Sequence, residues 1–160
     1  MLLSLDGAAT HLEQTRRAGD VRVAWTNGCF DLLHAGHVAL LKLARSEADL
    51  LVVGVNSDES VARLKGPTRP VCQLADRVAI LDELQCVDVV LVLGSDVPTP
   101  EIARLRPDVC FKDDSYASLP MPERATVEGY GGTVRLVPRV GQLSTTATIA
   151  RIADRERRSR

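Results

Sequence analysis

The sequence predicts an α/β fold, a Rossmann-like open and mainly parallel five-stranded sheet with helices on both faces. Short apolar runs alternate along the chain with segments of helical spacing, which is the pattern of β-α-β units. Several of these runs are apolar throughout, as expected of strands that are covered on both faces. The length of 160 residues and the 45% share of hydrophobic residues are sufficient for one sizeable core.

The first third of the chain is expected to hold two helices and two strands. A lead-in helix over residues 2–19 is indicated by the near-helical spacing of apolar residues, which stops at Gly19. Residues 21–25 form the first predicted strand. A helix with a broad apolar side follows over residues 37–48, and the continuous apolar run at residues 50–55 predicts the second strand.

The middle of the chain continues this alternation. A short helix should open after the second strand and reach residue 64, because Ser57 or Asp58 can cap it. Residues 65–70 contain a glycine and prolines and are expected to form a loop. Helical spacing over residues 73–85 and an apolar run at residues 87–93 predict the next helix and the third strand.

In the last third, Thr99 is expected to cap a short helix that has Pro100 at its first position. The remaining elements are predicted in chain order as a strand at 109–111, a polar loop at 112–122, a helix at 123–128, a strand at 133–137 and a helix that begins near Ser144.

Composition and charge narrow the classes of function. The formal net charge of −1 gives no global basic field, so no nucleic-acid partner is expected. No signal peptide or stretch of about 18 apolar residues is present, so a cytoplasmic protein without a membrane partner is expected. We expect a single domain over residues 1–160, with the lead-in helix at 1–19, the core at 21–152 and a basic tail at 153–160 that is a solvated helix end or disordered.

The four cysteines are scattered, without a Cys-x-x-Cys pair, and are expected to be buried free thiols. Cys29 lies near His34 and His37, but this proximity is a weak basis for a nucleophile. The two histidines have only His11 to complete a zinc site, so no metal held by protein ligands alone is expected.

The stretch from Thr26 to His37 indicates an anion site. A strand that runs through a glycine-containing turn into a helix directs backbone N–H groups and the positive helix end to one place. His34 and His37 are three residues apart and can share a face at the helix start, and Gly36 lets a ligand approach the backbone. Two imidazoles there can donate hydrogen bonds to a phosphate that gains charge during attack.

Other polar residues follow predicted strand ends, where ligands bind in open α/β sheets. These residues are Asn56, Asp58, Lys112 and Arg139.

Thr26-Asn27-Gly28-Cys29-Phe30-Asp31 together with His34-Ala35-Gly36-His37 resembles the signature of the cytidylyltransferase-like nucleotidyltransferase superfamily. Its members join a nucleoside triphosphate to a phosphorylated substrate and release pyrophosphate. More narrowly, the chain resembles the adenylyltransferase domain that converts D-glycero-β-D-manno-heptose 1-phosphate to ADP-heptose. The residues that carry this narrower likeness are Val55 to Asp58, Arg63 to Gly66, Arg69 to Val71, Arg77 and Ser144 to Thr146.

The resemblance implies roles for individual residues. Catalytic roles fall on His34, His37, Lys65 and Arg77. Nucleotide binding falls on Thr26, Gly28, Cys29, Phe30, His34, Gly36, His37, Lys112, Ser144, Thr145 and Thr146. Substrate binding falls on Asp31, Asn56, Asp58, Lys65, Asp114, Tyr116 and Arg139. The implied cofactor is Mg²⁺ bound mainly through the triphosphate, the implied partners are ATP or CTP and a sugar or alcohol phosphate, and a homodimer is possible because the family often forms dimers.

Local chemistry leaves alternatives open at four places. Lys65 lies in a loop that suits phosphate binding, although most loop lysines face water. Arg77 stands early in a helix, where a cation opposes the helix dipole unless it has another task. Ser144, Thr145 and Thr146 fit either a plain helix cap or a phosphate site, and Asp58 fits either a cap or a substrate contact.

The sequence departs from the heptose pattern after the fourth predicted strand. Lys112-Asp113-Asp114-Ser115-Tyr116 stands where heptose enzymes carry Lys-Gly-Gly-Asp-Tyr, and it leans toward the Gly-Asp-Asp-Trp of glycerol-3-phosphate cytidylyltransferases. Arg139 also matches an arginine of a motif in those enzymes. Adenylyl transfer to a heptose 1-phosphate is therefore the leading hypothesis, and cytidylyl transfer to glycerol 3-phosphate or a related alcohol phosphate is the alternative. A non-catalytic nucleotide sensor is the alternative of another class.

Overall fold

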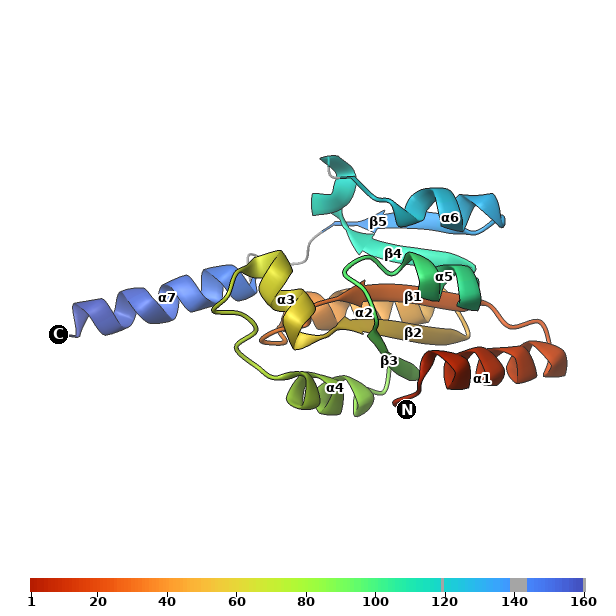
Figure 1. Cartoon of the computed structure of the whole chain (residues 1–160), viewed down its shortest axis with the longest axis horizontal. Helices are drawn as coiled ribbons and strands as arrows, with labels where there is room; N and C mark the ends of the chain where they lie inside the picture. The colour runs from red at the N-terminus through yellow and green to blue at the C-terminus, as the bar shows by residue number, and fades with distance from the viewer. Residues whose placement is uncertain (119, 139–143, 160) are drawn as a thin grey trace.

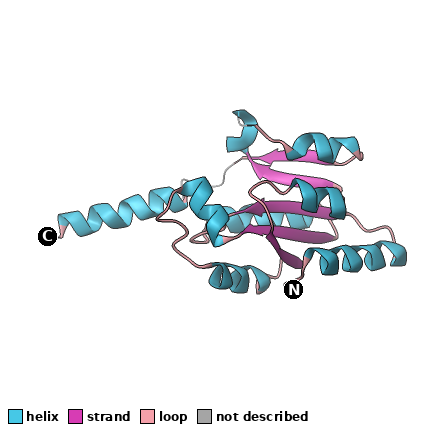
Figure 2. Cartoon of the chain, in the orientation of Figure 1, coloured by secondary structure: helices cyan, strands magenta, loops and turns pink. Residues whose placement is uncertain are grey.

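The computed structural model describes residues 1–118, 120–138 and 144–159. Over these residues, five parallel strands form one sheet in the order β3-β2-β1-β4-β5, with helices on both faces (Figures 1 and 2), which confirms the predicted fold class. The strands are β1 (Val23–Gly28), β2 (Leu50–Asn56), β3 (Val89–Leu93), β4 (Val109–Asp113) and β5 (Thr133–Val137). The helices are α1 (Leu5–Ala18), α2 (Ala35–Ser46), α3 (Asp58–Lys65), α4 (Leu74–Asp82), α5 (Thr99–Leu105), the 3-10 helix η1 (Asp114–Ser118), α6 (Glu123–Gly129) and α7 (Thr145–Arg158).

The first strand is shifted relative to its prediction. β1 begins at Val23 and continues to Gly28, because it pairs with β2 from Val23 opposite Leu50 to Gly28 opposite Val55. Thr26 and Gly28 therefore belong to the strand and not to the turn. The turn begins only afterwards, and there Phe30 has a φ of 48°, in the left-handed region that a side chain disfavours.

Other boundaries also differ from the predictions. Thr99 is the first residue of α5, with Pro98 at the cap position and no side-chain cap bond, so the predicted threonine cap is wrong. β4 extends to Asp113 because its last residues pair with β5, which shortens the predicted loop, and η1 follows directly. The helix-end alternative for the tail agrees with α7, which continues through residues 153–158 without a buried residue.

The core lies in two layers, one on each face of the sheet. Helices α1, α5 and α6 cover the face that carries Trp25, and α2 and α4 cover the face that carries Ala24, since successive strand residues point to opposite faces. Gly54 lets Trp25 pack closely. A Cβ atom at Gly54 would lie 2.8 Å from Trp25 Cζ2 and 2.7 Å from Leu93 Cδ2.

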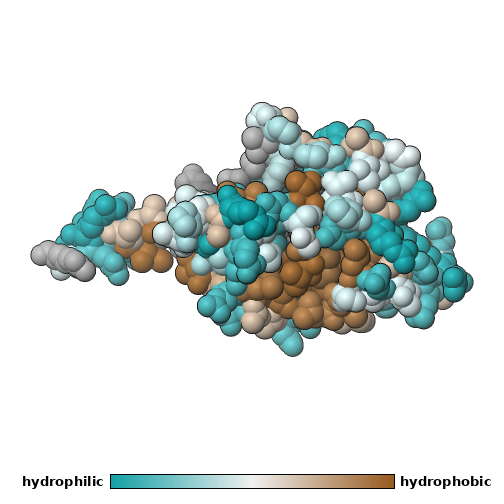
Figure 3. Space-filling view, viewed as in Figure 1, coloured by the Kyte–Doolittle hydropathy of each residue, from teal (hydrophilic) through white to brown (hydrophobic). Residues whose placement is uncertain are grey.

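The edge strand β3 is partly covered by the N-terminal segment. The amide of Leu3 donates to the carbonyl of Val90 at 2.9 Å, and the amide of Val90 donates to the carbonyl of Met1 at 2.9 Å. Apolar side chains still gather in the region of β3 on the face seen in Figure 3. Val92 of this strand is 39% exposed. None of the helices in the described ranges is long and apolar enough to cross a membrane.

Helix α7 stands apart from these layers. It projects away from the sheet in Figure 1, and none of its residues is buried. Its position is therefore set by contacts at its first turns, next to the turn that follows β1.

Candidate active site

The candidate site lies at the carboxyl ends of β1 and β4. β1 pairs with β2 on one side and with β4 on the other, so the strand order changes direction there. Ligands of open α/β sheets bind at such a switch point. The turn after β1 leads into α2, which places His34 and His37 at this edge.

The rings of His34 and His37 stack, with centroids 3.9 Å apart and planes inclined by 25°. His34 is the N-cap of α2, not a residue of its first turn, and its Nδ1 accepts a hydrogen bond from the amide of Gly36 at 3.1 Å. His37 Nδ1 accepts from the amide of His34 at 3.3 Å. Because Nδ1 is the acceptor in both rings, each neutral imidazole carries its proton on Nε2 and can donate it in a hydrogen bond.

Electrostatics keep His37 neutral. Burial, together with the neighbouring His34, lowers the pKa of His37 to about 4, although the carboxylate of Asp113 acts in the opposite direction. At neutral pH this ring is a hydrogen-bond donor without a charge. Phe30 contributes to the burial, with its ring centroid 5.4 Å from that of His37.

Asp31 anchors the turn after β1. The residue is 1% exposed, and its carboxylate accepts from Arg69 Nε at 2.6 Å and from the amide of Cys72 at 2.9 Å. Burial opposes the charge, but the bonds from the amides of Cys72 and Val71 and from Arg69 lower the pKa of Asp31 below its ordinary value. The structure places this carboxylate on protein donors, and its contact with substrate stays a prediction.

Arg77 ties the same turn to two helices. Its side chain is 1% exposed, and its guanidinium donates to the carbonyls of Cys29 and Cys72 at 2.5 and 3.1 Å and pairs with Asp58 at 2.7 Å. Asp58 also accepts from the amide of Leu74, whereas the cap of α3 is Ser57. Arg77 therefore supports the site through other residues, and its phosphate contact stays a prediction.

Lys112 is held inside the protein. Its Nζ lies 2.7 Å from Asn27 Oδ1 and 2.8 Å from Glu123 Oε1, and the side chains of this ion pair are only 4% and 5% exposed. The ammonium also lies 5.0 Å from the centroid of the Tyr116 ring. Burial raises the pKa of Tyr116, and the carboxylates of Asp113 and Glu123 raise it further.

Two predicted residues at strand ends are buried and bonded within the protein. Thr26 Oγ1 donates to the carbonyl of Phe111 at 3.0 Å, and Asn56 Nδ2 donates to Ser60 Oγ at 3.0 Å. Their contacts with nucleotide or substrate stay predictions.

Lys65, the last residue of α3, is exposed. Burial raises the pKa of the Cys29 thiol, although the positive charges of Lys65, Arg77 and Arg69 lower it. A thiol with a raised pKa is a poor nucleophile. Lys65 thus acts electrostatically on the turn after β1 while its own side chain faces solvent.

The first turn of α7 meets the site. Ser144 Oγ accepts from the amide of Ala147 at 3.1 Å, which confirms the cap, and Thr145 Oγ1 donates to the backbone carbonyl of Asp31. Thr146 is exposed, and so is Asp114 at the start of η1. Arg139 lies outside the described residues.

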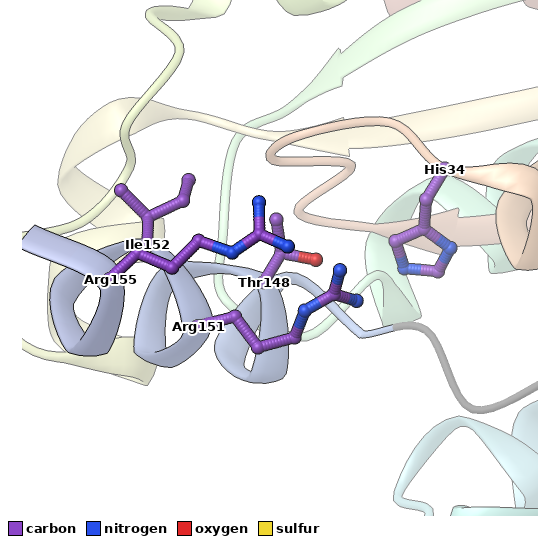
Figure 4. A pocket seen from close by; sticks show the side chains of 5 residues that line it. All are labelled: His34, Thr148, Arg151, Ile152 and Arg155. Carbon is purple, nitrogen blue, oxygen red and sulfur yellow. The ribbon is translucent and has the colours of Figure 1, made fainter. Parts of the chain in front are cut away.

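A cavity of about 290 Å³ separates His34 from α7. Figure 4 shows the guanidinium groups of Arg151 and Arg155 directed from α7 toward the His34 ring. The residues that line this cavity are His34, Thr148, Arg151, Ile152 and Arg155. Over the described part of the chain, no group of three or more His, Cys, Asp or Glu side chains is arranged to hold a metal ion.

The sequence profile of the cytidylyltransferase-like family matches residues 25–154. The chain belongs to this family. Among curated proteins it is 49% identical to the bifunctional protein HldE of Syntrophotalea carbinolica, over 90% of this chain and 29% of that protein. It is also 49% identical to the bifunctional protein HldE of Streptomyces coelicolor, over 86% of this chain and 30% of that protein. The chain thus spans about 30% of the length of these relatives.

Solved structures agree with the family. The lipopolysaccharide core biosynthesis protein from Thermoplasma volcanium has a TM-score of 0.62 and 26% identity, over 77% of this chain and 99% of that one. A pantoate-beta-alanine ligase from Francisella tularensis has a TM-score of 0.64 at 15% identity, over 89% of this chain and 68% of that one, and shares the fold. As a cytidylyltransferase-like protein, the chain is a nucleotidyltransferase, which confirms the expected class of enzyme.

Within this cytidylyltransferase-like fold, several site residues had no role assigned from the sequence. Asn27, Arg69 and Glu123 hold the buried charges, but they lie far from their partners along the chain and carry no local signal. The helical spacing of Arg151 and Arg155 is a sequence signal for their shared position. They follow Thr148 at positions i+3 and i+7 of a predicted helix, which places all three residues on one face.

Proposed function

We propose that this chain transfers a nucleoside monophosphate from a nucleoside triphosphate to the phosphate of a sugar 1-phosphate and releases pyrophosphate. ATP and D-glycero-β-D-manno-heptose 1-phosphate are the leading pair. The observation that carries the proposal is the stacked pair His34 and His37, in which both Nδ1 atoms accept from backbone amides, so that each neutral ring carries its proton on Nε2. The HldE relatives and the heptose-like motifs favour this acceptor.

In the proposed reaction, a phosphate oxygen of the acceptor attacks the α-phosphorus. The new P–O bond forms while the bond to the β-phosphate oxygen breaks, and pyrophosphate leaves. Negative charge grows on the oxygens around the α-phosphorus and on the leaving group. His34 and His37 would donate from Nε2 to this charge, and the fixed Nδ1 bonds orient the rings before the reaction begins.

The charged residues around the histidines have two different roles in this proposal. Lys65 is exposed at the end of α3 and can reach a phosphate, while Arg77 and Asp31 are bonded within the protein and position the turn that carries the histidines. The nucleophile and the leaving group both come from the substrates. No protein side chain has to form a covalent intermediate.

Mg²⁺ fits this site as an ion bound mainly to the triphosphate. Magnesium in nucleotide sites is usually held by phosphates with one or two carboxylates, and Asp113 is a carboxylate whose charge acts on His37. When bound, the ion would neutralise charge on the phosphates.

The second candidate is cytidylyl transfer to glycerol 3-phosphate or a related alcohol phosphate. It is favoured by Asp113 and Asp114, which stand at the end of β4 and the start of η1 where the heptose pattern has glycines. A carboxylate exposed at this edge would repel an anionic acceptor unless the acceptor presents hydroxyl groups there.

The rate of pyrophosphate release, compared between nucleotides and between acceptors, decides between these proposals. The purified chain would be mixed with ATP or CTP, Mg²⁺ and a panel of sugar 1-phosphates and alcohol phosphates. We expect the highest kcat/KM with ATP and the heptose 1-phosphate, and the His34→Ala variant controls for contaminating enzymes. A preference for CTP and glycerol 3-phosphate would replace the leading pair, and nucleotide binding without turnover on any acceptor would favour a sensor. Sedimentation checks separately whether the chain forms the homodimer that the family resemblance suggests.

A further inference from the structure

The stripe on α7 formed by Thr148, Arg151, Ile152 and Arg155 faces the candidate active site. These residues occupy positions i, i+3, i+4 and i+7, so they lie on one side of the helix. All four line the cavity whose opposite wall is His34. Figure 4 shows both guanidinium groups directed along the helix toward the imidazole.

The two arginines have no structural task that accounts for this placement. Both are exposed, and within residues 1–118, 120–138 and 144–159 no ion pair involves either guanidinium. They stand four residues apart on a helix, where like charges repel. The aspartate of this helix, Asp154, pairs instead with Arg157 on the other side. An anion in the cavity would relieve the repulsion.

The start of α7 is fixed in position relative to the histidine pair. Thr145 Oγ1 donates to the carbonyl of Asp31, three residues before His34, and the Asp31 carboxylate is itself buried against Arg69. The two cations therefore stand at a defined place relative to the position proposed for the α-phosphate. Both arginines lie too far along α7 for a phosphate between their guanidinium groups to contact the backbone amides at the start of the helix.

We propose that Arg151 and Arg155 bind the terminal phosphates of the nucleoside triphosphate and then the pyrophosphate product. This inference rests on the proposed nucleotidyl transfer and adds two residues to it. Guanidinium groups suit this ligand because each presents a planar fork of donors that matches phosphate oxygens. The volume of about 290 Å³ allows a diphosphate between the helix and His34.

The test measures the dissociation constant of inorganic pyrophosphate by calorimetry, without acceptor or nucleoside. Arg151→Ala and Arg155→Ala should each weaken pyrophosphate binding about fivefold, and the double variant about twentyfold, as expected for charge-assisted hydrogen bonds at an open site. Arg157→Ala removes the same charge from the opposite side of α7 and should leave the constant unchanged. Binding of the nucleoside monophosphate should be the same in all variants. Since α7 buries no residue, these substitutions leave the core intact, which circular dichroism checks.

The outcomes separate this inference from the proposed function. Equal pyrophosphate affinity in the wild type and the double variant overturns the roles of Arg151 and Arg155, even if the enzyme turns over ATP. An equal loss of pyrophosphate affinity in Arg157→Ala overturns these roles as well, because it would show that the affinity depends only on the net charge of the protein. A selective loss in a protein that turns over no acceptor supports the pyrophosphate site and contradicts the proposed transfer.

Discussion

Asp31 and Arg69 form an ion pair beneath the candidate active site, with Oδ2 and Nε 2.6 Å apart and side chains 0% and 11% exposed. The pair joins the turn after β1 to the segment before α4. Two backbone amides, those of Val71 and Cys72, share the same carboxylate. The histidine pair is therefore carried by a turn whose position depends on a buried charge.

Asp31→Asn should destabilise the protein by about 3–5 kcal/mol, the usual loss when one partner of a buried ion pair is removed. The asparagine keeps a carbonyl oxygen for one amide but leaves Arg69 without a countercharge. Chemical denaturation measures the free energy of unfolding. Asp96→Asn is the matched control, because its partner Arg63 is 58% exposed and the change should be small. Equal effects of the two substitutions would contradict the role given to Asp31.

Lys112 and Glu123 offer a second test of buried charge. Glu123→Gln should cost about 3–5 kcal/mol, because the Lys112 ammonium stays buried with Asn27 as its remaining close acceptor. The double variant with methionine at both positions should recover most of this loss, since an apolar pair has no charge to desolvate. Glu128→Gln, at an exposed pair with Arg124, is the control. A double variant as unstable as Glu123→Gln would show that packing, not charge, is lost.

The pKa of His37, lowered to about 4, makes stability depend on pH. The unfolded chain binds a proton at this residue near pH 6.5, whereas the folded chain stays neutral until about pH 4. The contribution of the neutral His37 ring to the free energy of unfolding is complete above pH 6.5 and is lost progressively as the pH falls toward 4. It amounts to at most about 3 kcal/mol. His37→Gln should flatten this part of the stability profile.

Nuclear magnetic resonance can follow the His37 ring directly during a pH titration, with the His37→Gln spectrum used to assign its signals. A midpoint near 4 is expected. A midpoint near 6.5 would show that the ring is solvated and charges freely.

The stacked histidines predict a specific ranking of variants in turnover. Asparagine and alanine at His34 or His37 should lower kcat by about 10²- to 10³-fold, the usual cost of losing a donor to a transition-state oxyanion. Glutamine should retain more activity than asparagine, because its amide nitrogen stands where Nε2 of the imidazole stood. The nucleotide dissociation constant should change far less than kcat. Parallel losses in binding and turnover, or asparagine variants that outperform glutamine variants, would sink the assigned role.

The sequence by itself determined the sheet and the place of the histidines. Apolar runs separated by helical spacing define parallel β-α units, since a strand covered on both faces must be apolar throughout. The strand-turn-helix around Thr26 to His37 likewise predicts a local anion site, because its donors are neighbours along the chain. These features are local, and the structure confirms the fold they imply.

Only the tertiary structure decided which charges face the cavity. Arg77 and Lys112 look alike in the sequence, as cations near strand or helix ends, yet both are buried against Asp58 and Glu123. Arg155 belongs to the basic tail at 153–160, which looks like a solvated helix end, and Arg151 lies just before this tail. Both residues nevertheless line the cavity beside His34. A cation is available to a ligand only if no carboxylate from another segment reaches it. That pairing is a property of the folded chain, because it joins residues that are distant in sequence.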